Sequence, residues 1–288
     1  MNRKGRALIG YMARDQALQV LNGGAQPTNG AISGLQEKWA GYHARVETRS
    51  VFEAKSPVIK SPALAAQRHL KAIAARPEIQ LAFAPHSWQL GIVDLSVPIL
   101  TYQSIVQIED AVERVAGVGR NDWDALMELC LPAPKEMQFE GGYEPAQNAF
   151  TISSMNPNLR VMSFEVVDVQ VPGPIPAQKK VFGFTFGLGS SYVQFVEYQN
   201  RWMVRDGHHR LYGLMKAGIQ TVPAVLIRAK NFEETGAGRP GFFGHEQLFG
   251  PRPPQIRDFM TDDLSAEVDV RAVRKIVRLR AEEFAIPV

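Results

Sequence analysis

Hydrophobic residues in the first quarter of the chain recur at the three- and four-residue intervals of amphipathic helices. Gly23-Gly24, Pro27 and Pro57 interrupt that periodicity. We therefore expect a helical N-terminal region over residues 1–85. Its three helices are expected at 12–21, 32–48 and 62–75.

Apolar and β-branched residues become denser after position 86, which indicates a change from helices to strands. We expect a strand over 91–97, then a helix from 102 to about 116 and a short helix over 123–129. The segment 117–180 is long and irregular, so we interpret it as an insertion with a strand at 164–171.

Two β-prone runs, 192–198 and 201–205, are separated by Gln199 and Asn200. Asn tolerates the positive φ that a tight turn requires, so this pattern predicts a β-hairpin.

After the hairpin the apolar spacing becomes helical, and Gly218 is placed to end a helix over 208–217. The apolar run 221–227 predicts a further strand. Because Pro223 lacks an N–H, that strand is expected at a sheet edge or with the proline near its start.

The last part of the chain, 231–288, contains two patterns. Residues 236–254 are dense in Gly, Pro and Phe, which indicates either an ordered loop held by aromatic rings or a mobile lid. Residues 270–284 place apolar and basic positions on different sides of a helix. We expect a C-terminal helix with a solvated basic face, and a partner-binding face is the alternative.

These elements together predict an α/β protein with a mixed sheet. Its core is expected over 86–230, between the helical N-terminal region and the C-terminal helix.

Composition narrows the class of protein. The chain has 288 residues, 45% of them hydrophobic, which is enough for one large domain or two small ones. No apolar run approaches the roughly 18 residues of a membrane span, and the N-terminus lacks the apolar block of a signal peptide. Cys130 is the single cysteine, which excludes an internal disulfide. We expect a cytoplasmic protein with no membrane partner.

Charge is distributed unevenly along the chain. Residues 1–76 contain twelve Lys and Arg against four Asp and Glu, a local balance of +8, so the remainder carries −5 of the net +3. Such asymmetry suggests a nucleic-acid or acidic partner for the N-terminal region.

The strongest chemical signal is the run Asp206, Gly207, His208, His209 and Arg210 at the predicted start of helix 208–217. The first N–H groups of a helix lack partners within it and lie at the positive end of its dipole, so this turn suits an anion. Gly207 allows close approach to the backbone, and the Arg210 fork matches two phosphate oxygens. The structural alternative is that Asp206 caps the helix, the histidines are surface residues and Arg210 pairs with a carboxylate.

The segment 202–227 resembles the ParB/sulfiredoxin superfamily in its strand-loop-helix-strand order. Its DGHHR motif, followed by Gly218-Ile219 and Val222-Pro223, is similar to the form found in free serine kinases of that superfamily. The resemblance implies nucleotide binding at this loop, as ATP binds in sulfiredoxins and CTP in ParB proteins. Val93-Asp94-Leu95 followed by Gln103 is a weaker likeness to the opening of a ParB-type core.

Departures from the pattern argue against two activities known in the superfamily. His208 lies where sulfiredoxins have their attacking cysteine, which argues against sulfinic acid reduction. The remainder after Ile227 is short and rich in Gly, Pro and charge, so we do not expect the DNA-binding region of ParB partition proteins there. The acidic catalytic residue of the serine kinases has no clear counterpart.

The resemblance therefore implies a nucleotide-dependent enzyme, most concretely a phosphotransferase that acts on a small molecule with ATP, ADP or CTP. Gly207, His208, His209 and Arg210 would bind phosphates, Asp206 or His208 would assist proton transfer, and Asp206 would hold Mg²⁺. The competing hypothesis is a nucleotide-gated module, without catalysis or with slow hydrolysis, that binds nucleic acid or a protein.

A second glycine-rich stretch, 182–191, is interpreted as a loop or bulge, because no helix follows it as a dinucleotide fingerprint requires. Gly187, Gly189 and Ser190 would line the same pocket if a nucleotide lies on the DGHHR turn.

Overall fold

The computed structural model describes residues 2–133, 140–154, 159–170, 178–188, 191–238, 241–271 and 275–286. The chain divides into two compact units. Unit 1 comprises Met1–Ala133 and Tyr192–Ala272, and unit 2 comprises Pro134–Ser191 and Val273–Val288.

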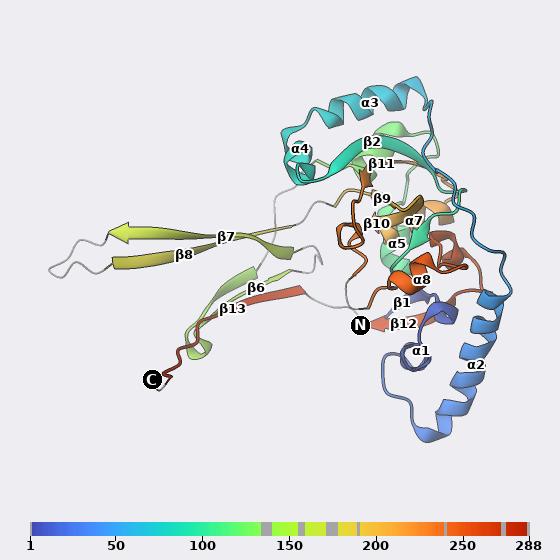
Figure 1. Ribbon diagram of the computed structural model, residues 1–288, viewed down its shortest axis with the longest axis horizontal. Helices are drawn as coiled ribbons and strands as arrows, with labels where there is room; N and C mark the ends of the chain where they lie inside the picture. The colour runs from blue at the N-terminus through green and yellow to red at the C-terminus, as the bar shows by residue number, and fades with distance from the viewer. Residues whose placement is uncertain are drawn as a thin grey trace. The chain divides into compact units, whose positions relative to one another are not determined.

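Unit 1 is built on a five-stranded mixed sheet in the order β2-β11-β9-β10-β3 (Figure 1). Strand β11 is antiparallel to β2 and parallel to β9. Strand β10 is antiparallel to β9 and parallel to β3. Mixed sheets with helices confirm the predicted α/β class. The strands are β2 (Ser87–Asp94), β11 (Thr221–Arg228), β9 (Gln194–Tyr198), β10 (Arg201–Asp206) and β3 (Leu100–Thr101).

The β9–β10 hairpin is confirmed. Gln199 and Asn200 connect the strands with φ angles of 48° and 60°, the two positive values that a type I′ turn requires. The predicted strand 221–227 is also confirmed as β11. Strand β11 lies inside the sheet and not at its edge. Its pairing with β9 begins only at Val225, so Pro223 precedes the paired residues on the β9 side.

Helices surround this sheet, and the three expected in the N-terminal region are confirmed. The helix after the hairpin is also confirmed, and Gly218 follows it with φ of 72°. The helices are α1 (Arg14–Leu21), α2 (Asn29–Glu47), α3 (Leu64–Ala74), α4 (Pro77–Phe83), α5 (Ile108–Arg114), α6 (Trp123–Cys130), α7 (His208–Lys216) and α8 (His245–Phe249), with short 3₁₀ turns η1 (Ile9–Tyr11), η3 (Glu233–Thr235) and η4 (Ile256–Met260).

Helices α5 and α7 pack unusually closely. A Cβ atom on Gly213 of α7 would lie 2.2 Å from the backbone oxygen of Ala111 of α5. Glycine is therefore required for this contact, which supports the first turns of α7 from one side.

A second sheet of unit 1 joins the two ends of its sequence. It has the order β12-β1-β4, with β1 (Asn2–Ala7) between β4 (Ile105–Gln107) and β12 (Ala266–Arg271). The helix expected from 102 to 116 is shorter, α5 over Ile108–Arg114, because β4 occupies residues 105–107.

The expected C-terminal helix at 270–284 is wrong. Residues up to Arg271 belong to β12, and residues 275–280 form β13 (Lys275–Arg280) of unit 2. Val277 and Leu279 are half-buried, whereas Ile276, Arg278 and Arg280 are exposed, which is a two-residue alternation. A short apolar run fits both periods, and pairing with distant strands decides between them.

Unit 2 is formed by β strands among its described residues. Its three-stranded sheet has the order β13-β6-β5, with β5 (Glu140–Glu144), a 3₁₀ turn (Pro145–Gln147) and β6 (Ala149–Ser154). A separate antiparallel ribbon contains β7 (Leu159–Gln170) and β8 (Gln178–Leu188). The strand expected at 164–171 is confirmed to Gln170, and Val171 lies outside the described residues.

Of the loop or bulge expected at 182–191, the loop is wrong for residues 182–188, although the pairing does have a register shift between Val161 and Ser163, opposite Phe186 and Thr185. Residues 182–188 belong to β8 and pair with β7, for example Phe184 with Phe164. The glycines are tolerated in a two-stranded ribbon because Phe182, Phe184 and their partners make the cross-strand contacts.

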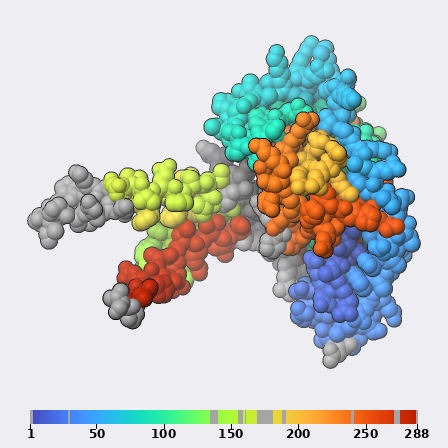
Figure 2. Space-filling view, in the orientation of Figure 1, coloured from blue at the N-terminus to red at the C-terminus, as the bar shows by residue number. Residues whose placement is uncertain are grey.

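The segment 236–254 is ordered by its aromatic rings in the part described. Arg201 donates from Nη1 to the backbone oxygens of Leu248 and Gly250 at 2.8 and 3.0 Å, and the rings of Tyr198 and Phe249 lie 5.6 Å apart. Figure 2 shows this orange segment packed directly against its neighbours in unit 1. No helix in the described ranges has the length and apolar character needed to cross a membrane.

Candidate anion-binding site

The turn between β10 and α7 opens a helix whose N-terminus no side chain caps. Gly207 occupies the N-cap position with φ of 94°, and its backbone oxygen accepts from Leu211 N at 2.9 Å as the first bond of the helix. The N–H groups before Leu211 therefore lack acceptors within the helix. A Cβ atom at position 207 would also lie 3.0 Å from Val193 Cγ2, so both conformation and space require glycine.

Asp206 is not the N-cap, but its side chain binds the turn. Its Oδ1 accepts a hydrogen bond from Gly207 N at 2.6 Å, and the residue is half-buried at the end of β10. The structural alternative is thus met in part, because the carboxylate does satisfy one N–H of the turn. Over the described ranges no three His, Cys, Asp or Glu residues gather to hold a metal, so any Mg²⁺ at Asp206 depends on other ligands such as phosphate.

His208 is a buried, neutral imidazole. It is 2% exposed, its ring centroid lies 5.1 Å from that of Tyr102, and Nε2 has no hydrogen-bond partner within the described structure. Burial, and secondarily the neighbouring His209, hold the pKa of His208 well below its ordinary value. A buried nitrogen without a hydrogen-bond partner lowers the stability of the fold unless a ligand or water binds it. Such atoms are common at functional sites.

His209 is half-buried beside α5. Burial, and secondarily the positive charge of Arg114, lower the pKa of His209 to about 4, although Asp110 acts in the opposite direction. Asp110 is itself ion-paired with Arg3 of β1. Both histidines of the motif are therefore uncharged at neutral pH.

Arg210 carries the positive charge of the turn and is 6% exposed. Its Nη1 donates to the backbone oxygen of Leu129 at 3.0 Å, so part of the fork is directed toward α6. Burial lowers the pKa of Arg210 and Asp206 raises it, but a guanidinium stays protonated in proteins. The adjacent Cys130 thiol is fully buried, which raises its pKa to about 12, so the thiol is neutral and does not offset the arginine.

Several residues around the turn were not identified from the sequence. Tyr102 donates its hydroxyl to the backbone oxygen of Arg205, and Phe242 covers the Tyr102 ring at 4.8 Å between centroids. Arg205 Nη2 lies 3.4 Å from His86 Nε2. These residues come from segments about a hundred positions apart, and the one available signal was the aromatic content of the loop containing Phe242.

The secondary site residues Gly187, Gly189 and Ser190 belong to unit 2, whereas the turn belongs to unit 1. Gly187 lies in β8 of unit 2, where a Cβ atom would contact the Met162 side chain at 3.0 Å. Gly189 and Ser190 lie outside the described residues.

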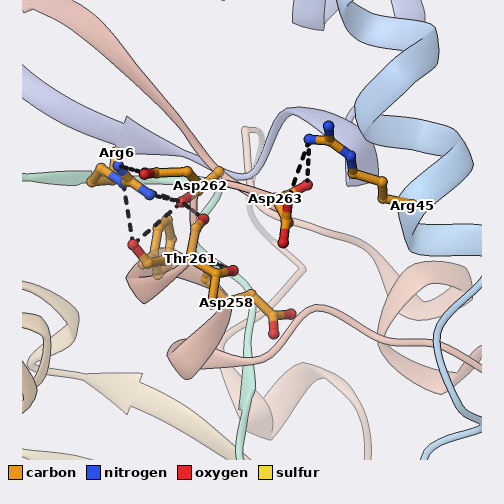
Figure 3. A network of polar contacts seen from close by, with 8 residues as sticks. Arg6, Arg45, Asp258, Thr261, Asp262 and Asp263 are labelled. Atoms are coloured by element: carbon orange, nitrogen blue, oxygen red, sulfur yellow. Dashed lines mark hydrogen bonds and ion pairs between the residues drawn. The ribbon is translucent and has the colours of Figure 1, made fainter.

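The basic residues of the N-terminal region are mostly paired in the fold. Seven of the twelve Lys and Arg at 1–76 lie within 4.0 Å of a carboxylate, and most of these acids come from distant positions. Figure 3 shows two examples, Arg6 with Asp262 at 2.6 Å and Arg45 with Asp263 at 3.6 Å. The charge asymmetry along the sequence is thereby reduced in three dimensions.

Two cavities of about 350 and 570 Å³ occur in unit 1, and the DGHHR turn lines neither of them. No protein-family model, curated protein or solved structure matches this chain significantly.

Proposed function

We propose that the β10–α7 turn binds the phosphate groups of a nucleotide. The observation that carries the proposal is the buried Arg210 in the first turn of a helix whose N-terminus no side chain caps. Backbone N–H groups, the helix dipole and the charge of the arginine each favour an anion at this turn.

The electrostatics of the turn support an anion that brings its own hydrogen-bond acceptors. Neutral His208 and His209 add donors or acceptors without adding charge, and Arg210 acts in a poorly solvated environment where its field is weakly screened. The unpaired Nε2 of His208 fits a ligand atom or a bound water.

Within this proposal, ATP, ADP or CTP is the nucleotide, and Asp206 joins the phosphates in holding Mg²⁺. Transfer of a phosphoryl group to a small-molecule acceptor depends mainly on positioning and on stabilising charge, and the N–H groups with Arg210 provide both. Nucleic acid is the less favoured partner, because ion pairs within the fold already engage most of the basic residues at 1–76.

The test is the thermal unfolding of the protein with each nucleotide, with and without Mg²⁺. A ligand that binds only the native state must raise Tm, by an amount equivalent to about 2.7 kcal/mol at one hundred times Kd. Arg210→Met replaces the guanidinium with an uncharged, unbranched side chain, so we expect it to abolish the nucleotide-dependent rise in Tm. Arg210→Lys keeps the charge and should retain part of that rise.

Arg45→Met is the matched control, because Arg45 is half-exposed and lies on α2, away from the turn. Isothermal titration of each variant separates loss of binding from loss of stability. A normal nucleotide affinity in Arg210→Met would refute the site, and an unchanged wild-type Tm with every nucleotide would refute the function.

A further inference from the structure

The larger of the two cavities described above, about 570 Å³, lies at the opposite end of α7 from the DGHHR turn. Met215 of the last helical turn and Gln220 before β11 line it, together with residues of η4. Helix α7 has nine residues, so about 12 Å separates its two ends. The cavity is therefore a separate site from the proposed nucleotide site.

Arg49 enters this cavity in a fixed position. Its Nη1 donates to Asp258 Oδ2 at 2.8 Å and to the hydroxyl of Tyr11, and the guanidinium carbon lies 5.9 Å from the Tyr11 ring centroid. Both hydrogen bonds use Nη1. Contacts among the described residues leave Nε and Nη2 of Arg49 without a protein acceptor.

Asp258 is the buried anchor of this arrangement. It is 2% exposed and accepts from the Tyr11 hydroxyl at 2.8 Å and from Gln255 N at 2.9 Å, in addition to Arg49. Figure 3 shows its carboxylate directed away from the Arg6–Asp262 pair. Because every partner of Asp258 is internal to the fold, the orientation of Arg49 is set before any ligand binds.

The charges that line the cavity sum to +1. Arg49 and Arg257 are positive and Asp258 is negative, and Arg257 is exposed with no ion-pair partner in the part of the chain that the structure describes. A singly charged anion balances this total, whereas a phosphate monoester would leave excess negative charge.

The rest of the wall is uncharged. Leu95, Met215, Met260 and Leu264 form its apolar part, and Ser96, Gln220 and Thr261 its uncharged polar part. The two methionines adapt readily to ligands of different shape. A volume of this size is within the usual range for small-molecule sites, which combine an apolar wall with a few polar groups.

We infer that this cavity binds a small organic carboxylate with an aliphatic body. The unused N–H groups of Arg49, assisted by Arg257, bind the carboxylate in the paired geometry that guanidinium groups favour. The aliphatic part lies on the methionine and leucine side chains. The proposal does not depend on nucleotide binding at the other end of α7.

Titration of the full chain with hexanoate, hexanol and hexyl phosphate tests the inference by calorimetry and thermal shift. We expect hexanoate to bind and raise Tm, hexanol to bind at least tenfold more weakly because it lacks the charge, and hexyl phosphate to bind more weakly than hexanoate. Equal affinity for hexanoate and hexanol would overturn the inference.

Variants locate the binding site. Arg257→Ala changes an exposed residue, so the fold should persist while hexanoate affinity falls about tenfold. Arg49→Lys keeps the charge, loses the fork and should weaken binding similarly. Arg45→Ala removes a positive charge from a residue that does not line the cavity, so affinity should not change.

If Arg257→Ala and Arg45→Ala bind hexanoate equally well, the cavity is not the site. Arg257→Ala should leave any nucleotide-dependent Tm shift intact, and Arg210→Met should leave hexanoate binding intact. The two proposals can therefore fail separately.

Discussion

The histidines of the DGHHR turn give the molecule an expected pH dependence at the residue scale. In the folded protein the pKa of His209 is about 4 and that of His208 is also lowered, against about 6.5 when unfolded. As pH falls below 6.5, the unfolded chain binds protons that the native protein excludes. Stability is thus complete above about pH 6.5 and is lost toward pH 4, by about 3 kcal/mol for His209.

Urea unfolding at pH values from 8 to 4.5 measures this effect. His209→Gln retains hydrogen-bonding capacity without a titrating group, so its free energy of unfolding should depend less steeply on pH. An identical slope in the variant and the wild type would contradict the assignment.

At the residue scale, the sequence predicts only those parts of the site whose residues are adjacent in the chain. Asp206 to Arg210 lie together because they are neighbours in the chain, and the positive φ of Gly207 follows from its role at the start of a helix. The Leu129 oxygen that binds Arg210 and the Tyr102 ring beside His208 are about 80 and 106 positions away. No local pattern identifies such partners.

At the scale of elements, the contact between α5 and α7 makes a sharp prediction. Gly213→Ala places a Cβ atom 2.2 Å from Ala111 O, so the helices must separate, at an expected cost of about 1–3 kcal/mol. The matched control is Gly41→Ala in α2, where no atom lies within 4 Å of the added carbon. That substitution should stabilise by up to about 1 kcal/mol.

Urea unfolding of the two variants compares them directly. Equal stabilities would show that α7 is not held against α5 as described. Nucleotide affinity in Gly213→Ala should also fall, since α5 supports the first turns of α7.

The sequence predicts a helix or strand correctly where a nearby turn or cap residue marks its end. It does not where the element depends on pairing with a distant strand. The β9–β10 hairpin, α7 and β11 each have their own turn residue or cap, Asn200, Gly207 and Gly218 among them. Strands β12 and β13 have no such signals and take their form from β1 and β6, whose positions in the sequence are more than a hundred residues earlier.

At the scale of the whole molecule, unit 1 is made from two separate stretches of chain. The excursion into unit 2 leaves and returns at nearly the same point, because Val193 N donates to Cys130 O at 2.7 Å. A chain of residues 1–133 joined by a short Gly/Ser linker to 192–272 should therefore fold.

Calorimetry of this shortened chain should show one cooperative transition, with the same hexanoate affinity and the same nucleotide response as the full protein. Absence of a cooperative transition would mean that unit 1 requires unit 2 for stability.

The pairing of β1 with β12 has a consequence for how the protein is made. Asn2 lies opposite Arg271, so β1 is completed by a strand that the ribosome makes more than 260 residues later. At about 5–20 residues per second, β1 waits on the order of half a minute for this partner. During that interval one edge of β1 is unpaired, and the newborn chain depends on α5, β4 or a chaperone to keep the strand from joining another molecule.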